Sequence, residues 1–270
     1  MNIPDRQYVK LKTGQVSFRQ AGQGNDLVLL HGLAGNSRTW QKQFDYFSKQ
    51  FRVTAWDAPG YGESDSVTGD VNVYTQLLNE FTNAIGLKTF ILLGHSMGGI
   101  VAGNFSSQFP ERVSKLILSC TFLGHKQSKG SPLSKNYRLR LAQFDKMTSI
   151  NYGYARAKSM TAPGCDPNIL CNFAQIAAET RKEGLQNAMR VILEANNGPS
   201  FVSLNMPVLV LAGELDTTVS KSLTEAMVSA IPNSIPYIKV LYLKNVAHAP
   251  YMASPDNYNS ALSDFLFSLT

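Results

Sequence analysis

Short apolar runs that recur along this chain of 270 residues restrict the folds it can adopt. Most runs are four to six residues long and rich in branched side chains, as in strands buried on both faces of a parallel sheet. They occupy residues 27–30, 51–56, 90–93, 116–118, 208–211 and 238–243. Wider apolar spacing, typical of helices packed on a sheet, follows at residues 74–85, 98–109, 222–231 and 257–269. The alternation predicts a doubly wound, mostly parallel α/β sheet.

Two further segments complete the predicted architecture. Residues 8–11 and 16–19 flank a Thr13-Gly14 turn, which predicts an antiparallel hairpin at the sheet edge and brings the sheet to eight strands. Residues 122–204 contain no clear strand, but turn residues separate several helix-like pieces. We therefore expect a core domain of residues 1–121 and 205–270, with residues 122–204 inserted as a helical lid.

The motif Gly94-His-Ser96-Met97-Gly98 joins a predicted strand directly to a predicted helix. A serine on such a sharp turn needs very small residues two positions before and two positions after it, and glycine stands at both. The turn lifts the Ser96 hydroxyl above the sheet. It also places the Met97 N–H at a helix N-terminus, where a donor and the helix dipole both favour an oxyanion. We therefore predict that Ser96 is a nucleophile.

A tetrahedral intermediate needs a second donor, and the loop after residues 27–30 can supply it. Gly32 and Gly35 permit unusual backbone angles in this loop. We expect the Leu33 N–H to lie beside the Met97 N–H and to complete an oxyanion hole.

A serine hydroxyl needs a histidine to accept its proton and a carboxylate to orient that histidine. Asp216 and His248 both follow predicted strands, at the C-terminal edge where ligands collect in open α/β sheets. The carboxylate of Glu214 is a rival to Asp216. The other histidines are His31 and His95, which belong to backbone motifs, and His125, at the entrance of the predicted lid. We predict a catalytic triad of Ser96, Asp216 and His248.

Over nearly its whole length the sequence resembles the α/β-hydrolase family. The shared motifs are His31-Gly32, the Asp57-Ala-Pro-Gly-Tyr-Gly-Glu-Ser64 turn, the GHSMGG segment at residues 94–99, Gly213-Glu-Leu-Asp216 and His248. The order serine, aspartate, histidine also matches this family. The resemblance implies an α/β-hydrolase fold with a lid after the strand that ends near residue 120.

The leading functional hypothesis is an enzyme, a serine esterase or lactonase that works through an acyl-Ser96 intermediate without a cofactor. Relatives that cleave carbon–carbon bonds of ring-cleavage products use the same triad, but they resemble GNSMGG and carry a tryptophan soon after the histidine. This chain has His95 before Ser96 and Ala249-Pro250 after His248. A small-molecule receptor or signalling protein of the same fold is a further alternative.

Composition limits the possible partners. Three cysteines, and four histidines without metal-ligand spacing, predict reduced thiols and no metal site. The N-terminus has no apolar leader, and no apolar run is long enough to span a membrane, so we expect a cytoplasmic protein. The net charge of +6 is concentrated between residues 124 and 159 rather than spread over a nucleic-acid-binding face.

Two sets of residues have both a structural and a functional interpretation. Trp40, Tyr61, Phe122 and Tyr251 are candidates for the pocket wall, although core positions are the favoured interpretation. The basic residues of the predicted lid, including Arg138 and Arg140, belong either to a solvated helix surface, which we favour, or to a site that recruits an anionic small-molecule substrate.

Overall fold

A computed structural model of the chain describes residues 3–267, which contain one eight-stranded sheet. The strands are β1 (Arg6–Leu11), β2 (Gly14–Ala21), β3 (Asn25–Leu30), β4 (Phe51–Trp56), β5 (Phe90–His95), β6 (Val113–Ser119), β7 (Val208–Gly213) and β8 (Ile238–Leu243). Their order in the sheet is β1-β2-β4-β3-β5-β6-β7-β8. Strand β2 pairs antiparallel with both β1 and β4, and all the other pairs are parallel. The predicted fold class and the N-terminal hairpin are confirmed.

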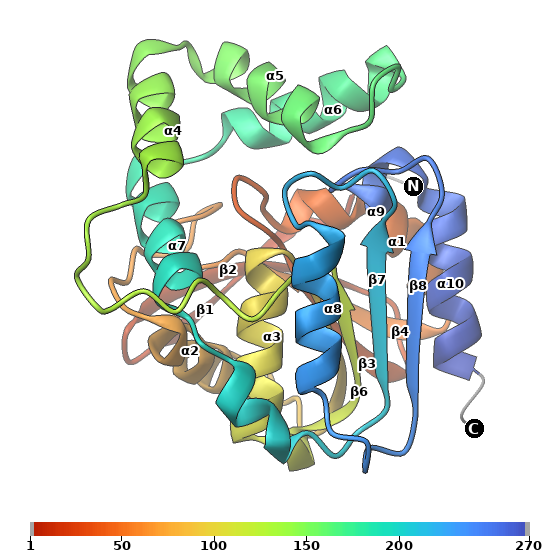
Figure 1. The fold of residues 1–270 in the computed structure, drawn as a ribbon. Helices are drawn as coiled ribbons and strands as arrows, with labels where there is room; N and C mark the ends of the chain where they lie inside the picture. Colours follow the sequence, from red (N-terminus) through yellow and green to blue (C-terminus); the bar gives the residue numbers. More distant parts are fainter. Residues whose placement is uncertain (1–2, 268–270) are drawn as a thin grey trace.

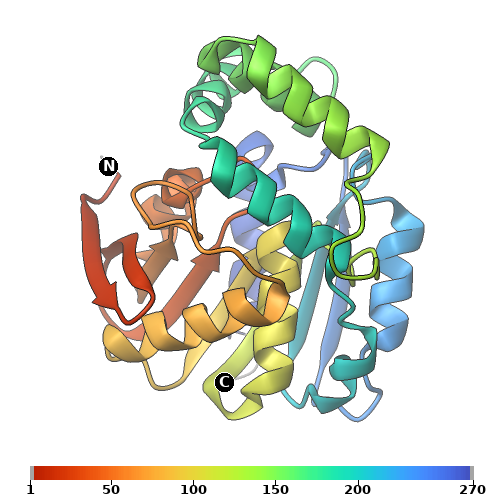
Figure 2. The same cartoon turned by 90° about the vertical axis from the view of Figure 1, so that its left-hand side faces the viewer.

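Helices cover both faces of the sheet (Figures 1 and 2). They are α1 (Gln41–Phe47), α2 (Val71–Ala84), α3 (Met97–Gln108), α8 (Lys221–Ala230), α9 (Pro250–Ala253) and α10 (Pro255–Phe267). Helices α2, α3 and α8 lie on the face nearest the viewer in Figure 1, and α1 and α10 lie on the other. Helix α10 begins at Pro255, two residues before the predicted range of 257–269, with proline at the first helical position and Asp256 in the first turn, both of which favour a helix start. Helix α1 was not predicted.

The segment of residues 122–204 contains no strand within the described part of the chain. Its elements are α4 (Lys135–Lys146), α5 (Ser149–Met160), α6 (Pro167–Ala178), α7 (Lys182–Glu194) and the 3₁₀ helix η3 (Gly198–Ser203). In Figure 1, α5 and α6 lie above the C-terminal ends of β7 and β8, while α7 descends toward α3. The segment therefore stands over the sheet edge where the candidate site residues collect.

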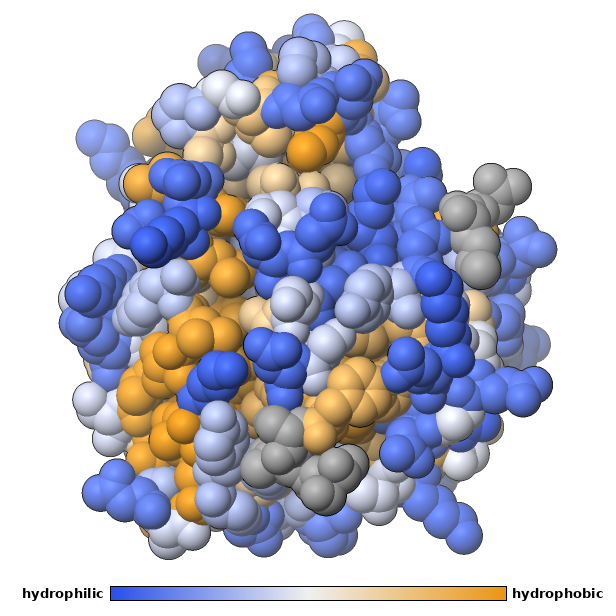
Figure 3. Space-filling model, turned by 90° about the vertical axis from the view of Figure 1, so that its right-hand side faces the viewer, coloured by the Kyte–Doolittle hydropathy of each residue, from blue (hydrophilic) through white to orange (hydrophobic). Residues whose placement is uncertain are grey.

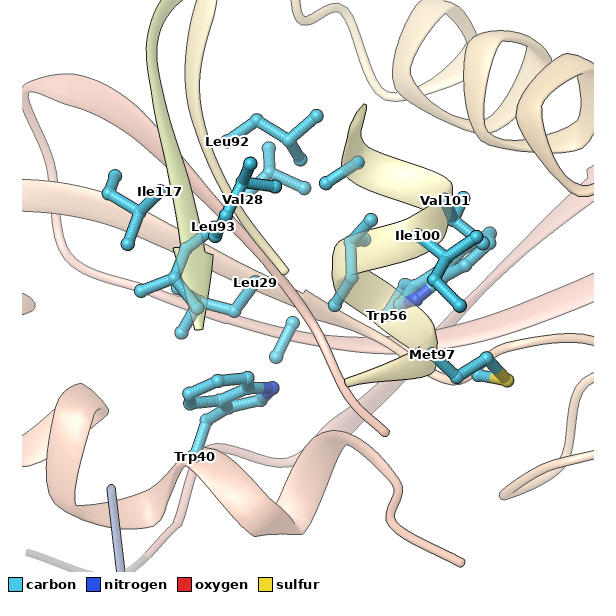
Figure 4. Packing of buried hydrophobic residues seen from close by; sticks show 14 of the residues in the cluster. Val28, Leu29, Trp40, Trp56, Leu92, Leu93, Met97, Ile100, Val101 and Ile117 are labelled. Atoms are coloured by element: carbon cyan, nitrogen blue, oxygen red, sulfur yellow. The ribbon is translucent and has the colours of Figure 1, made fainter. Parts of the chain in front are cut away.

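The central strands are almost wholly buried, as their continuous apolar runs predicted. Every residue of β5 and β7 is buried. Figure 4 shows Leu29 and Leu93 gathered between α3 and Trp40, whose indole is fully buried. Dense packing on both faces fixes the strand ends in space, so loops that leave them present side chains in defined positions.

The sheet edge formed by β8 is less well covered. Its residues are exposed or partly buried, and Ile238 is 41% exposed. Figure 3 faces this side of the molecule and shows apolar side chains grouped among polar ones. Between residues 3 and 267, no helix is both long enough and apolar enough to cross a bilayer.

Candidate active site

Ser96 occupies a strained turn between β5 and α3. Its backbone angles are φ 54° and ψ −117°, a region that costs a residue with a Cβ about 1–3 kcal/mol. A Cβ on Gly94 would lie 2.2 Å from the Gly98 carbonyl oxygen, and a Cβ on Gly98 would lie 2.4 Å from the Leu30 carbonyl oxygen. Close packing on both sides of the turn therefore holds the strained serine and requires glycine at positions 94 and 98.

The side chains of Ser96, His248 and Asp216 form a continuous hydrogen-bonded series. Nε2 of His248 lies 3.0 Å from Oγ of Ser96, and Nδ1 of His248 lies 2.7 Å from Oδ2 of Asp216. Because an ionised carboxylate only accepts, Nδ1–H is the donor to Asp216, and Nε2 is left free to accept the serine proton. The structure thus brings together the three side chains that the sequence singled out, at a buried position.

Asp216 is fixed from a second side. Its Oδ1 accepts hydrogen bonds from the N–H of Thr218, at 2.8 Å, and of Val219, at 3.0 Å. Burial alone would raise the pKa of the Asp216 carboxyl, but the hydrogen bond and charge of His248 and the two backbone N–H groups hold that pKa below its ordinary value. The rival carboxylate of Glu214 is exposed and accepts from the N–H of Asn245 instead.

His95 is a site residue whose role the sequence did not indicate. Its Nε2–H donates to the carbonyl oxygen of His248 at 2.7 Å, and the two rings lie 4.9 Å apart between centroids. Burial, together with the charge of His248, lowers the pKa of His95 to about 3, so this ring is neutral near pH 7. His95 therefore holds the backbone at residue 248 without adding a second titration in the neutral range.

The loop that follows β3 lies directly against Ser96. A Cβ on Gly32 would lie 3.0 Å from Cβ of Ser96, so the absence of a side chain allows this approach. Leu33 lines the same cavity as Ser96. Met97 is the first residue of α3, and the N–H of a first helical residue has no intrahelical acceptor. The two residues whose N–H groups are predicted to be oxyanion donors are thus both close to Ser96: Leu33 lines the same cavity, and Met97 follows Ser96 in the chain.

His31 and Asp57 stabilise the backbone around this loop through hydrogen bonds. Nε2 of His31 accepts from the N–H of Ala58 at 3.0 Å, so its Nδ1–H donates to the carbonyl oxygen of Gly32 at 2.9 Å. The buried carboxylate of Asp57 accepts from the Ser17 hydroxyl and from a backbone N–H, each at 2.6 Å. Both side chains are occupied in holding backbone segments together.

A small cavity of about 60 Å³ opens onto Ser96. The sheet domain contributes Leu33, Ser96 and His248 to its wall, while segment 122–204 contributes Tyr137, Arg140 and Arg156. Arg140 and Arg156 belong to the basic stretch of residues 124–159, but the sequence alone could not show which way their side chains point. Arg138, considered beside Arg140, is exposed instead and donates to the Leu133 carbonyl oxygen.

The four aromatic candidates for the pocket wall divide between core and cavity. Trp40, Tyr61 and Tyr251 are almost completely buried and are not among the residues that line the cavity. Phe122 does line it, and its ring packs edge-on against His125. Core packing is therefore the correct interpretation for three of these four residues.

Potential metal ligands also lie close together near Ser96. Ligand atoms of His95, Cys120 and His248 lie within 4.8 Å of one another. The His248 ring already bonds Ser96 and Asp216, and Nε2 of His95 bonds a backbone carbonyl. Because a metal here would compete with these hydrogen bonds, the expectation of a metal-free site stands as a prediction.

The chain belongs to the alpha/beta hydrolase fold family, whose model matches residues 26–253. This confirms the resemblance indicated by the motifs. The chain is 27% identical over 263 residues to a pimeloyl-[acyl-carrier protein] methyl ester esterase of Vibrio parahaemolyticus, covering 92% of this chain and 96% of the relative. A protein of the same name from Photobacterium profundum is 26% identical over 260 residues, covering 94% and 99%.

Solved structures share the fold at lower identity. The enol-lactonase from Burkholderia xenovorans superposes with a TM-score of 0.83 at 20% identity, covering 96% of this chain and 99% of that one. A thermophilic esterase from Thermogutta terrifontis superposes with a TM-score of 0.82 at 23% identity, covering 98% of both chains.

Proposed function

We propose that this protein is a serine hydrolase that cleaves a carboxylic ester or a lactone through an acyl-Ser96 intermediate. The observation that carries the proposal is the hydrogen-bonded series Ser96, His248 and Asp216, which ends in a cavity between the sheet and segment 122–204. An alcohol next to a neutral imidazole that a carboxylate orients is the arrangement required for acyl transfer.

In the first half of the reaction, Nε2 of His248 takes the proton from Oγ of Ser96 while Oγ attacks the ester carbonyl carbon. The negative charge that develops on the carbonyl oxygen is stabilised by the N–H groups of Leu33 and Met97, the latter at the N-terminus of α3. Protonated His248 then gives its proton to the leaving alcohol, and the acyl group remains on Ser96.

In the second half, water enters where the alcohol left. His248 removes a proton from this water, the resulting nucleophile attacks the acyl carbon, and Ser96 leaves with the proton returned. Asp216 keeps the imidazole in the required tautomer throughout and stabilises the transient imidazolium. The proposed mechanism needs neither a metal nor an organic cofactor.

The names of the relatives support ester chemistry. Two of the similar proteins are named methyl ester esterases, and two solved structures of the same fold are described as an enol-lactonase and an esterase. Each name denotes hydrolysis at an acyl–oxygen bond. We therefore place ester and lactone cleavage ahead of carbon–carbon bond cleavage for this chain.

We further propose that residues 122–204 act as a lid over a core of residues 1–121 and 205–270. Tyr137 of α4, Arg156 and Met160 of α5 and Ile192 of α7 all line the cavity, so this segment shapes the substrate pocket. A cavity of about 60 Å³ is small beside the roughly 300–1,000 Å³ of pockets for drug-sized ligands. Long acyl chains thus require the lid to move.

The test is a hydrolysis screen over aryl esters of graded acyl length, lactones and vinylogous diketones, with Ser96→Ala as the matched control. Ester or lactone turnover that falls by several orders of magnitude in a folded Ser96→Ala variant supports the proposal. Turnover of the diketones alone would make carbon–carbon cleavage the function. One slow turnover with a long-lived adduct, together with a ligand-dependent partner, would identify a receptor.

A further inference from the structure

Arg156 occupies a position on α5 where an apolar side chain is expected. The buried face of this helix carries Tyr152, Arg156 and Met160 at intervals of four residues, which is the spacing of one helix face. Arg156 is only 7% exposed. An arginine is rarely buried to this extent unless an acidic group pairs with it.

No carboxylate pairs with Arg156 within residues 3–267. Its guanidinium donates to Oγ of Ser159 at 2.9 Å and to the thioether sulfur of Met160 at 3.2 Å. The buried Nε–H has no hydrogen-bond partner at all. A guanidinium offers five donors, and a thioether is a weak acceptor, so most of the hydrogen-bonding capacity of this group is unused.

A second guanidinium adds to the positive charge. Arg140 of α4 lines the same cavity, and its guanidinium lies over the ring of Tyr137, 5.6 Å from the centroid. In the described chain it also forms no ion pair with an acid. Burial, and then the positive charge of Arg140, lower the pKa of Arg156 to about 10, which leaves the guanidinium charged at neutral pH.

A backbone contact connects the helix that carries Arg156 to the loop that carries His248. The carbonyl oxygen of Met160, at the end of α5, accepts from the N–H of Ala249 at 3.0 Å, and Ala249 directly follows His248. Gly153 allows α5 to pack tightly on α6, since a Cβ there would lie 2.1 Å from the Ala174 carbonyl oxygen. Arg156 is thus held one helical turn from the loop that carries the imidazole.

The buried positive charge of Arg156 has no counterion and is destabilising by itself, and the positive charge of the partly buried Arg140 in the same cavity repels it. An anionic group of a ligand would offset both effects. A carboxylate has the planar shape that matches the guanidinium fork and is small enough for this cavity.

We propose that Arg156, assisted by Arg140, binds a carboxylate carried by the substrate, so that the ester or lactone cleaved at Ser96 is also a carboxylic acid. This inference rests on the proposed hydrolase function and narrows it to anionic substrates of small size. It also revises the interpretation of the basic lid residues as a solvated surface, because Arg140 and Arg156 face the cavity while Arg138 faces solvent.

The experiment compares matched pairs of substrates. Each pair consists of the monomethyl ester of succinate, glutarate or adipate and the corresponding methyl ester in which a carboxamide replaces the free carboxylate. The ratio of kcat/KM for acid over amide is measured in the wild type, Arg156→Gln, Arg156→Lys and Arg140→Gln. Arg138→Gln, the same change at the exposed position on α4, is the control.

We expect the wild type to prefer the acid for at least one chain length. Arg156→Gln should lower the acid-to-amide ratio by about 10- to 100-fold, the usual effect of losing a charge-assisted hydrogen-bonded pair. Arg140→Gln should lower it less, Arg156→Lys should restore part of it, and Arg138→Gln should leave it unchanged. A wild type without preference for the acid, or a ratio unaltered in Arg156→Gln, overturns the inference.

A binding measurement separates this inference from the proposed function. Glutarate is titrated calorimetrically into Ser96→Ala and into the double variant Ser96→Ala/Arg156→Gln. Binding that weakens at least tenfold in the double variant supports the carboxylate site even if no ester is turned over. Equal binding, or none, to both variants contradicts it, while hydrolysis of neutral esters would still uphold the hydrolase proposal.

Discussion

Replacing Asp216 by asparagine is a demanding test of the proposed mechanism, because the hydrogen bonds around this side chain fix the orientation of the new amide group. Two backbone N–H groups, of Thr218 and Val219, point at Oδ1 of Asp216, so the carbonyl oxygen of an asparagine must occupy that position. Its NH₂ group then faces Nδ1 of His248. The ring can accept this hydrogen bond only if its proton moves to Nε2, and in that tautomer it cannot accept the proton of Ser96.

The expected loss in kcat for Asp216→Asn is about 10⁴-fold. A loss of this size accompanies the aspartate-to-asparagine change in the triad of a serine protease, where the catalytic histidine takes the wrong tautomer. This corresponds to about 5 kcal/mol of activation free energy. Turnover of p-nitrophenyl acetate, normalised to folded protein, measures it. Glu214→Gln is the matched control, since Glu214 is the nearby exposed carboxylate, and it should change kcat by less than about twofold. If Asp216→Asn keeps a tenth of the wild-type activity, the assignment of Asp216 as the acid is wrong. The assignment is also wrong if Glu214→Gln loses as much activity as is expected for Asp216→Asn.

Three further predictions follow from the surroundings of His248. Asp216 should stay ionised above pH 5, because its pKa is held below the usual ~3.9. Any fall of log kcat/KM on the acid side above about pH 5 should therefore have a slope of one, and a slope of two would contradict this. His95→Phe should lower kcat about 10- to 100-fold, because the His248 imidazole is then misplaced. His95→Gln keeps a hydrogen-bond donor and should recover part of the lost activity. An equal loss of kcat in both variants would refute the positioning role of His95. Arg156→Met should raise Tm by about 2 °C or more by removing an unpaired buried charge, whereas a fall of several degrees would show that the guanidinium stabilises the fold.

The sheet was predictable because its signals are local. Fully buried strands such as β5 and β7 appear as continuous apolar runs, and the start of α10 is marked by proline at its first position. Helix α1 was missed because it spans only seven residues and leaves little room for a periodic pattern. The hairpin of β1 and β2 was found because Gly14 supports the required turn, with φ of 134°.

The candidate site was predictable only in part. Ser96, Asp216 and His248 could be found because each follows a strand, and parallel strands bring their C-terminal ends to one edge. The orientation of Arg156 could not be found, because the helical periodicity of α5 shows which residues share a face but not which neighbouring element that face meets. The contact from His95 to the carbonyl of His248 joins residues 153 positions apart, and no local pattern encodes it.

The central claim is that Oγ of Ser96 forms a covalent bond to the acyl group. Intact-protein and peptide mass spectrometry after rapid acid quench of p-nitrophenyl acetate turnover tests this claim most directly. The proposed mechanism predicts one acetyl group per protein, on the peptide that contains Ser96, present in the wild type and absent from Ser96→Ala. Acetyl transfer to another residue, or steady turnover by Ser96→Ala at the wild-type rate, would contradict it.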